Sequence, residues 1–256
     1  MYLQKKDQKL EMGEVLPLME AFNTIQGEGY YKGSAAYFIR VGGCDVGCHW
    51  CDVKESWNPN LHPVTSITKI IDAAKKCSDT VVVTGGEPLM WNMGPLTQGL
   101  KALSIKIHIE TSGAYPLSGY WDWFCLSPKK NKLPQVNAYN RADELKIIIY
   151  NKDDFSFAES QAQNVRLNCK LYLQPEWSKR EKMIPLIVDY IMKNPKWKIS
   201  LQDSFMVGDT WKDIDAGKSA GCSTILIERD YNLEVKADYV VKNANEAANL
   251  VVKILY

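Results

Sequence analysis

Helical and strand patterns alternate through most of the chain, and this alternation restricts the possible folds more than any other feature. A helix face at Ile67, Ile70, Ile71 and Ala74 is followed by a β-branched run at 80–83. Strands that alternate with helices form parallel sheets with helical crossovers. We therefore predict an α/β fold whose sheet is open or partly closed into a barrel. Further helix faces are expected at 93–103 and 183–191, and further strands at 36–41, 105–109, 123–126, 145–150, 170–173 and 197–201.

The alternation changes character after Gln202. A strand at 205–207 leads into Gly208-Asp209, and a helix at about 213–220 ends at Gly221, a typical C-terminal capping residue. Two more strands are expected at 224–227 and 239–241, before a last helix capped by Asn243. The 256 residues suit one large domain or two small ones. We expect a main domain at 1–202 and a Rossmann-like βα fragment at 203–256.

Composition narrows the class of protein. With 46% hydrophobic and 24% charged residues, the chain is an ordinary globular protein, which excludes disorder, a coiled coil or collagen as the main architecture. A net charge of +1 argues against direct nucleic-acid binding. No apolar run is long enough to span a bilayer, and residues 1–10 have no signal-peptide pattern. We expect a cytoplasmic protein without a membrane partner.

Polar residues follow four of the expected strands. The strand at 80–83 runs into Thr84-Gly85-Gly86-Glu87-Pro88, and similar polar endings occur at 110–113, 127–129 and 174–176. Ligands of parallel α/β sheets bind at the carboxyl ends of strands. Each ending alone is typical of a turn, but together they favour a shared site for a polar ligand. The glycine pair would let backbone N–H groups approach that ligand closely.

Three of the seven cysteines lie within eight residues, as Cys44, Cys48 and Cys51 in a C-x3-C-x2-C loop. Three thiolates leave one metal position of an iron–sulfur cluster open, which is typical of a reactive centre. A structural zinc site would need a fourth ligand, for which Cys77 is the candidate, and three incidental core cysteines are the remaining alternative. The other four cysteines are expected to be small buried hydrophobic residues: Cys77, Cys125, Cys169 and Cys222.

The cysteine loop followed by a strand ending in Gly-Gly-Glu-Pro resembles the radical S-adenosylmethionine (SAM) superfamily. From about residue 18 to 202 the chain is similar to the 7-carboxy-7-deazaguanine synthases. This resemblance implies a partial (βα) barrel of radical SAM type at 1–202. The motifs that carry it lie, in chain order, at 24–29, 38–40, 43–45, 84–88, 110–111, 127–129, 144–146, 174–175 and 197–202.

The resemblance also implies site residues. Cys44, Cys48 and Cys51 would hold a [4Fe-4S] cluster, and Arg40 would clamp a substrate carboxylate with its planar guanidinium. The other implied substrate contacts are Ile25, Gln26, Gly27 and Thr84. The implied SAM contacts are Trp50, Gly86, Ser127, Pro128, Lys129, Gln174, Pro175, Glu176 and Trp177.

The implied reaction converts 6-carboxy-5,6,7,8-tetrahydropterin to 7-carboxy-7-deazaguanine with loss of ammonia, on the route to queuosine. A cofactor radical starts it, while the protein positions and shields the substrate. The implied partners are this small pterin, an electron donor such as flavodoxin or ferredoxin, and a second copy in a homodimer. The alternatives are another radical SAM enzyme, or an impaired synthase fused to a phosphatase-like or docking fragment.

Val53 departs from the family pattern. The family places a hydroxyl residue after Cys-Asp, where it helps to bind Mg²⁺, whereas valine has no side-chain oxygen for a hard cation. Either Mg²⁺ binds through substrate, water and backbone, or the dependence on Mg²⁺ is weakened. Mg²⁺ is therefore expected as a cofactor without a named side-chain ligand.

The segment after Gln202 is the larger departure. It resembles the last part of a haloacid-dehalogenase-type phosphatase, similar to the heptose-bisphosphate and histidinol-phosphate phosphatases, whose late Mg²⁺ motif matches Asp209 and Asp213. That family's nucleophile motif, Asp-x-Asp-x-Thr, does not occur in the chain. Without this aspartate no phosphoaspartate can form. The segment is a fusion, a docking module or an extension of the sheet, and the two acids could instead be helix-start residues.

Overall fold

The computed structural model describes residues 8–200, 205–219 and 223–255. The chain divides into two compact units, one of Met1–Thr24 with Ala35–Ser200 and one of Ile25–Ser34 with Leu201–Tyr256. The sequence-based boundary at 202/203 falls among residues outside the described part, so it stays a prediction. Among the described residues, no helix is long and apolar enough to cross a membrane.

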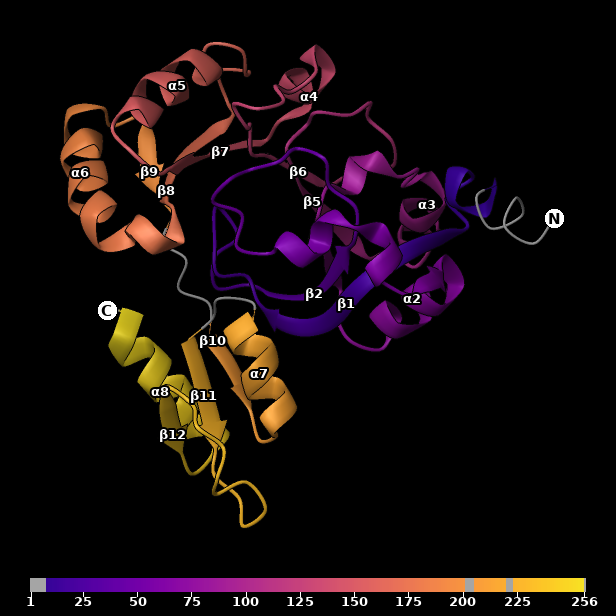
Figure 1. Cartoon of the computed structure of the whole chain (residues 1–256), viewed down its shortest axis with the longest axis vertical. Helices are drawn as coiled ribbons and strands as arrows, with labels where there is room; N and C mark the ends of the chain where they lie inside the picture. Colours follow the sequence, from indigo (N-terminus) through magenta and orange to yellow (C-terminus); the bar gives the residue numbers. More distant parts are fainter. Residues whose placement is uncertain (1–7, 201–204, 220–222, 256) are drawn as a thin grey trace. The chain divides into compact units, whose positions relative to one another are not determined.

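The first unit is an α/β unit built on one nine-stranded sheet of order β3-β1-β2-β4-β5-β6-β7-β8-β9. The strands from β2 onward pair in parallel, whereas β3 is antiparallel to β1. Figure 1 shows the helices α2 to α6 around the outside of this curved sheet. The elements are β1 (Val15–Ile25), β2 (Ala35–Val41), η1 (Lys54–Trp57), η2 (Pro59–Leu61), β3 (Val64–Ser66), α2 (Ile67–Lys75), β4 (Thr80–Gly85), η3 (Pro88–Met90), α3 (Gly94–Ala102), β5 (Lys106–Thr111), β6 (Trp123–Leu126), α4 (Val136–Arg141), β7 (Glu144–Ile149), α5 (Asp153–Ala162), β8 (Lys170–Pro175), η4 (Trp177–Lys179), α6 (Arg180–Lys193) and β9 (Trp197–Ile199).

The β-branched and leucine-rich strands supply the core of the first unit. One hydrophobic cluster centres on Ile39, Val83 and Leu96, and a second on Ile109, Leu145 and Ile147. Each of these side chains is fully excluded from solvent. Burial of this kind is the main driving force for folding. The predicted α/β class, with a mostly parallel sheet that is open or partly closed into a barrel, is confirmed for this unit.

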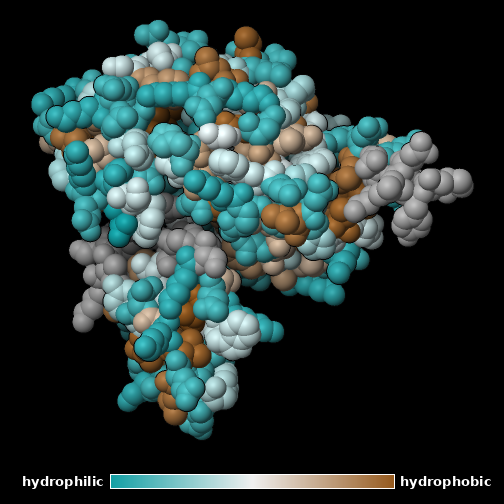
Figure 2. All heavy atoms as spheres, in the orientation of Figure 1, coloured by the Kyte–Doolittle hydropathy of each residue, from teal (hydrophilic) through white to brown (hydrophobic). Residues whose placement is uncertain are grey.

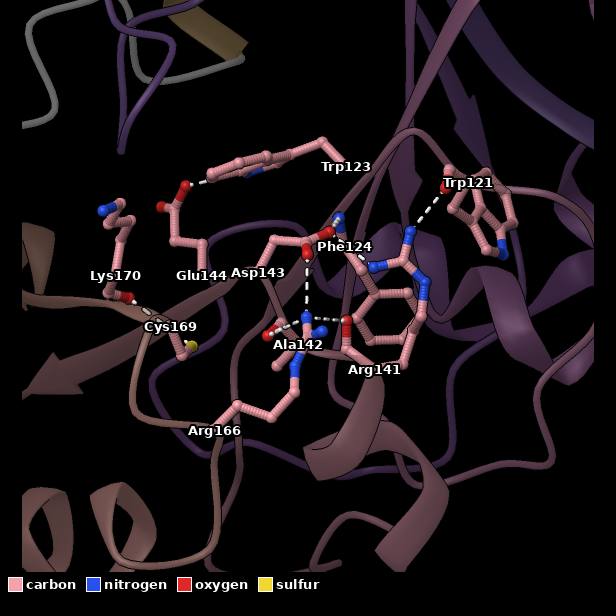
Figure 3. Close-up of polar contacts among 10 residues, drawn as sticks. All are labelled: Trp121, Trp123, Phe124, Arg141, Ala142, Asp143, Glu144, Arg166, Cys169 and Lys170. Carbon is pink, nitrogen blue, oxygen red and sulfur yellow. Dashed lines mark hydrogen bonds and ion pairs between the residues drawn. The ribbon is translucent and has the colours of Figure 1, made fainter.

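A polar network fastens the amino ends of β6 and β7 (Figure 3). The Asp143 carboxylate accepts hydrogen bonds from the Phe124 backbone N–H, Arg141 Nη1 and Arg166 Nη2, at 3.0, 2.5 and 2.9 Å. Arg141 also donates to the Trp121 carbonyl oxygen. In parallel α/β folds the amino ends of strands serve stability, and the opposite ends carry function. We assign this network to stability.

The second unit contains a parallel three-stranded sheet of order β10-β11-β12. Its described elements are β10 (Phe205–Gly208), α7 (Trp211–Ser219), β11 (Ser223–Ile227), β12 (Tyr239–Val241) and α8 (Ala244–Leu255). Asn243 caps α8 as predicted, because its Oδ1 accepts the Glu246 N–H at 2.9 Å. The predicted helix end at Gly221 lies outside the described residues.

Three sequence expectations need correction or addition. Cys77 is exposed at the end of α2, so it is not a buried hydrophobic residue; Cys125 and Cys169 are buried as predicted, and Cys222 lies outside the described residues. The long strand β1 was not predicted, nor were the helices α4 and α5.

On the face drawn in Figure 2, hydrophobic residues form small patches among hydrophilic ones, as on ordinary protein surfaces.

Candidate active site

The cysteine loop leaves the carboxyl end of β2 and is fixed by the backbone of η1. The Gly43 N–H donates to the Ser56 carbonyl oxygen at 2.6 Å, and the Cys44 N–H donates to the Trp57 carbonyl oxygen at 3.2 Å. Cys44, Cys48 and Cys51 are free and half-buried. Burial raises the pKa of the Cys44 thiol to about 11 and also raises that of Cys48. The charge of other loop cysteines also raises the pKa of each of these two thiols, because the three cysteines lie near one another.

These thiols fit an iron–sulfur cluster better than a single zinc ion. In the described part of the chain, no group of three Cys, His, Asp or Glu side chains could hold one metal ion. An iron–sulfur cluster does not need three side chains around one metal ion, because each thiolate binds a different iron. The raised pKa values are no obstacle, since a metal ion deprotonates the thiol that coordinates it. Exposed Cys77, the candidate fourth zinc ligand, is not part of a metal-binding group.

The glycine pair after β4 packs against the cysteine loop. Gly85 has φ +114°, and a Cβ there would lie 2.4 Å from the Val41 carbonyl oxygen; a Cβ on Gly86 would lie 2.4 Å from the Gly43 carbonyl oxygen. The Gly86 and Glu87 N–H groups donate to those same two oxygens, at 2.7 and 2.8 Å. For Gly86, the expectation that the backbone N–H of the glycine pair faces a ligand is therefore wrong. The Gly86 and Glu87 N–H groups hold the loop against β4.

Glu87 joins the ends of two neighbouring strands. Its side chain is 1% exposed, and it accepts hydrogen bonds from the Leu89 N–H at 3.0 Å and the Ser112 N–H at 2.8 Å. It also accepts from Thr111 Oγ1 at 2.5 Å and from the Ser112 hydroxyl. A buried carboxylate persists only with such partners. Glu87 thereby fixes the turn after β4 to the end of β5.

Lys129 lies at the end of β6, close to the cysteine loop. Its Nζ donates to the carbonyl oxygen of Ser127 at 2.7 Å and to Oγ of the same residue at 2.6 Å, and it lies 5.7 Å from the centroid of the Trp50 ring. Burial lowers the pKa of Lys129, while the nearby Cys48 opposes that change. The structure therefore brings three of the expected SAM contacts, Trp50, Ser127 and Lys129, together beside the cysteine loop.

The next strands of the sheet contribute a second buried lysine, from β7, and a buried polar residue at the end of β8. Lys146 of β7 is 6% exposed and pairs with the Glu110 carboxylate of β5 at 3.0 Å. Gln174 at the end of β8 is buried and accepts a hydrogen bond from Ser200 Oγ at 3.3 Å. Glu176 caps η4 through the Ser178 N–H at 3.1 Å. The remaining expected positions of this group are buried Pro128 and Pro175 and half-buried Trp177.

The expected substrate residues divide between the two units. Arg40 and Thr84 are register partners on β2 and β4. Arg40 Nη1 also donates to Glu20 Oε1 of β1 at 2.5 Å, so its guanidinium is already oriented. Ile25, Gln26 and Gly27 belong to the second unit, and their proximity to Arg40 stays a prediction.

The two acids of the C-terminal fragment have protein partners. Asp213 accepts hydrogen bonds from the Thr210 N–H at 3.0 Å and from Thr210 Oγ1 at 2.7 Å, and its own N–H returns one to Thr210 Oγ1 at 3.2 Å. This reciprocal pattern is a capping box at the start of α7. Asp209 Oδ2 accepts the Tyr231 hydroxyl at 2.7 Å. The capping box favours the helix-start interpretation for Asp213, and metal binding by either acid stays a prediction.

Three contacts near the site had no sequence signal. Glu20 is 20 positions from Arg40, and Thr111 is 24 from Glu87, so only the sheet order brings each pair together. Trp57 donates its indole N–H to Cys51 Sγ at 3.4 Å. Its position six residues after Cys51 matches no metal-ligand spacing, because tryptophan does not coordinate metals.

Comparisons with known proteins agree with this geometry. A family model described as "Radical SAM superfamily" matches residues 38–125, and one described as HAD-hydrolase-like matches residues 180–251. The 7-carboxy-7-deazaguanine synthase of Flavobacterium psychrophilum is 67% identical over 193 residues, which are 75% of this chain and 92% of that protein. The synthase of the same name from Synechocystis is 46% identical over the same shares of both chains.

A solved structure has a similar fold. The crystal structure of QueE from Escherichia coli superposes with a TM-score of 0.67 at 27% identity, over 77% of this chain and 97% of that one. The Cys44–Cys51 loop and the turn after β4 lie within residues 38–125, which the radical SAM family model matches. The chain belongs to the 7-carboxy-7-deazaguanine synthase family of radical SAM enzymes.

Proposed function

We propose that this chain converts 6-carboxy-5,6,7,8-tetrahydropterin to 7-carboxy-7-deazaguanine and releases ammonia. The observation that carries the proposal is the loop of three free, half-buried cysteines, held by backbone hydrogen bonds against the Gly-Gly-Glu-Pro turn of β4. The 67% identical relative has the matching name. Cys44, Cys48 and Cys51 would hold a [4Fe-4S] cluster, which together with SAM supplies the radical that starts the reaction.

The protein's own part in the reaction is to bind and orient. Arg40 would clamp the pterin carboxylate, because its fork is held by Glu20 and its side chain is only 12% exposed. Lys129, fixed by Ser127 beside Trp50, places one positive charge next to the cysteine loop. This charge suits the carboxylate of SAM. Gly86, Pro128, Gln174, Pro175, Glu176 and Trp177 complete the proposed cofactor positions.

Anaerobic reconstitution of the protein with iron and sulfide, followed by turnover with SAM, dithionite and the pterin, tests the proposal. Formation of 7-carboxy-7-deazaguanine and 5′-deoxyadenosine, measured by mass spectrometry, is the expected result. A protein that carries a full cluster but leaves the pterin unchanged would contradict it. Arg40→Lys is the informative variant, because lysine keeps the charge but loses the bidentate fork. It should raise KM for the pterin roughly tenfold with a smaller effect on cluster content.

Mg²⁺ is proposed as a weak cofactor without a side-chain ligand at Val53. The valine is 8% exposed, and its carbonyl oxygen already accepts hydrogen bonds from Ser56 N and Oγ at 3.0 and 2.6 Å. Neither the side chain nor this carbonyl is therefore well suited to a hard cation. Activity should depend little on Mg²⁺, and Val53→Thr should increase that dependence. A strong loss of activity of the unchanged protein in EDTA would contradict the proposal.

The remaining proposals concern partners and domains. A flavodoxin or ferredoxin is proposed to supply the electron to a homodimer in the cytoplasm, where the described free thiols would stay reduced. Light scattering and turnover with each donor test these points.

We also propose that 203–256 is a separate domain without phosphatase activity, because the Asp-x-Asp-x-Thr nucleophile motif does not occur in the sequence. Mg²⁺-dependent hydrolysis of p-nitrophenyl phosphate by cluster-free protein would contradict this.

A further inference from the structure

Trp57 contacts both ends of the cysteine loop. It is the last residue of η1, the single turn that follows the third cysteine. Its carbonyl oxygen accepts the Cys44 N–H at 3.2 Å, while its indole Nε1 lies 3.4 Å from Cys51 Sγ. The indole N–H can only donate, so the sulfur is the acceptor. Trp57 thus holds the backbone of the first cysteine of the loop and the thiol of the third.

We propose that Trp57 sets the reduction potential of the cluster through its N–H···S hydrogen bond to Cys51. The inference rests on the proposed function, in which Cys51 is a ligand of a [4Fe-4S] cluster. Hydrogen bonds to the sulfurs are among the factors that fix the potential of such clusters. Trp57 is a positioning and tuning residue in this proposal. It does not touch the substrate or the reacting atoms.

The sign of the effect follows from charge. Reduction adds one electron to a cluster whose sulfur ligands already carry negative charge. An N–H donor stabilises the more negative, reduced form more than the oxidised form, because a charged acceptor strengthens the hydrogen bond. Partial burial of Trp57 and Cys51 keeps water from replacing this donor fully. The hydrogen bond therefore raises the potential and makes reduction by the electron donor easier.

The chain offers a matched control at Trp91. Its indole N–H donates to the Gly42 carbonyl oxygen at 2.8 Å, and its ring lies against the Cα of Gly43, where a Cβ would come within 2.8 Å of the ring. Trp91 therefore adjoins the same loop, is half-buried like Trp57, and gives its hydrogen bond to a backbone oxygen. Trp57→Phe and Trp91→Phe delete the same chemical group, but only the first deletes a bond to sulfur.

The experiment compares the two variants with the unchanged protein after anaerobic reconstitution. Iron and sulfide contents are measured first, and the potential is then determined by redox titration followed by electron paramagnetic resonance. Trp57→Phe should make one-electron reduction about tenfold less favourable, which corresponds to a potential about 59 mV more negative. Trp91→Phe should leave the potential unchanged. An unchanged potential in Trp57→Phe, or equal shifts in both variants, would overturn the proposal.

A second measurement detects the hydrogen bond itself. Protein labelled with ¹⁵N-tryptophan is reduced, and pulsed electron paramagnetic resonance is used to detect ¹⁵N coupled to the cluster electron spin. The expected result is a ¹⁵N coupling that Trp91→Phe retains and Trp57→Phe loses. Trp57→Phe is needed because Trp50 of the same loop is labelled in all three proteins. A spectrum without this coupling in the unchanged protein, or with the same couplings in Trp57→Phe, would overturn the inference. Failure of the unchanged protein to take up a cluster would instead contradict the proposed function, so the two failures can be told apart.

Discussion

Both units carry polar residues in or shortly after parallel strands, but the hydrogen bonds of these residues differ between the two units. In the first unit these residues bond across strands: Thr111 to Glu87, 24 positions apart, and Lys146 to Glu110, 36 apart. In the second unit, Asp213 bonds to Thr210, three positions away, as the cap of its own helix. Cross-strand bonds fix several strand ends relative to one another, as a binding site requires. A cap stabilises one helix only.

The units also differ in how much core supports them. The first has two large hydrophobic clusters, whereas the described cluster of the second consists of Ile225, Val241 and Ala247, with partly buried neighbours such as Phe205. Small cores give little stability. The comparison indicates that the first unit can hold strained or polar features for function, and that the second depends on its caps. The predictions below test this contrast, beginning with the largest effect.

Cys51→Ala should abolish both cluster uptake and product formation. The substitution removes one of three proposed iron ligands, and the loop provides no fourth cysteine to replace it. Cys77→Ala is the control, because Cys77 is free but exposed at the end of α2. It should keep normal iron content and activity. Iron and sulfide analysis measures cluster uptake, and mass spectrometry measures the product. A Cys51→Ala protein with full cluster content would show that the cysteine loop is not the cluster-binding site.

Glu87→Ala should destabilise the region of β4 and β5 by about 3 kcal/mol. The substitution leaves the buried Ser112 N–H, Leu89 N–H and Thr111 hydroxyl without their acceptor. Hydrogen exchange of the 80–113 segment measures the local loss, and activity should fall with it because the cysteine loop is tied to the same turn. Glu87→Gln keeps an acceptor oxygen and should cost clearly less. Equal effects of both substitutions would mean that shape, and not hydrogen bonding, is what Glu87 contributes.

The sequence predicts the repetitive parts of the first unit well. The β-branched runs of β4 and β5 and the periodic faces of α2, α3 and α6 are local signals, and the structure confirms them. It predicts β1 poorly, because Val15–Ile25 mixes a proline with good helix formers such as Leu18, Met19 and Ala21. It also misses α5, whose sequence DDFSFAESQA is mostly polar. The periodicity of hydrophobic residues alone cannot distinguish such segments from loops.

The site shows the same limit. The cysteine loop and the Gly-Gly-Glu-Pro turn are short, contiguous motifs, so the sequence alone locates them. The partners of these motifs depend on which strands are neighbours, and no local pattern encodes this. Glu20 meets Arg40 because β1 lies beside β2 in the sheet order. The role of the Gly86 N–H was misjudged for the same reason, since the Val41 oxygen that it contacts comes from another strand.

Glu159→Gln tests whether non-local bonds also dominate away from the site. Glu159 of α5 accepts hydrogen bonds from Tyr190 Oη, Lys196 Nζ and Trp197 Nε1 at 2.7, 2.5 and 2.8 Å. Burial tends to raise the pKa of this carboxyl, but these donors outweigh burial and lower the pKa from its ordinary value of 4.5. The resulting stabilisation is complete above about pH 4.5 and is lost as the pH falls through the lower pKa of the folded protein.

The substitution should therefore cost about 1 kcal/mol at pH 7 and progressively less below pH 4.5. Hydrogen exchange of α5 and α6 at several pH values measures the difference. Asp189→Asn is the control, because its pair with Lys193 is exposed on both sides and should contribute almost nothing at either pH. A cost for Glu159→Gln that does not change with pH would show that the lost contacts are not those of the ionised carboxylate.

Asp213→Ala gives the smallest expected effect and tests the second unit. Loss of the capping box should destabilise α7 by about 0.5–1 kcal/mol, measured as faster hydrogen exchange of residues 210–219. Asp215→Ala, an exposed acid on the same helix, should have less effect. Mg²⁺ should not slow the hydrogen exchange of α7 in the unchanged protein or in either variant, because both hydrogen bonds that the Asp213 carboxylate accepts come from Thr210. If Mg²⁺ protects the unchanged α7 but not Asp213→Ala, the carboxylate is a metal ligand, and the contrast between a binding rim in one unit and simple caps in the other no longer holds.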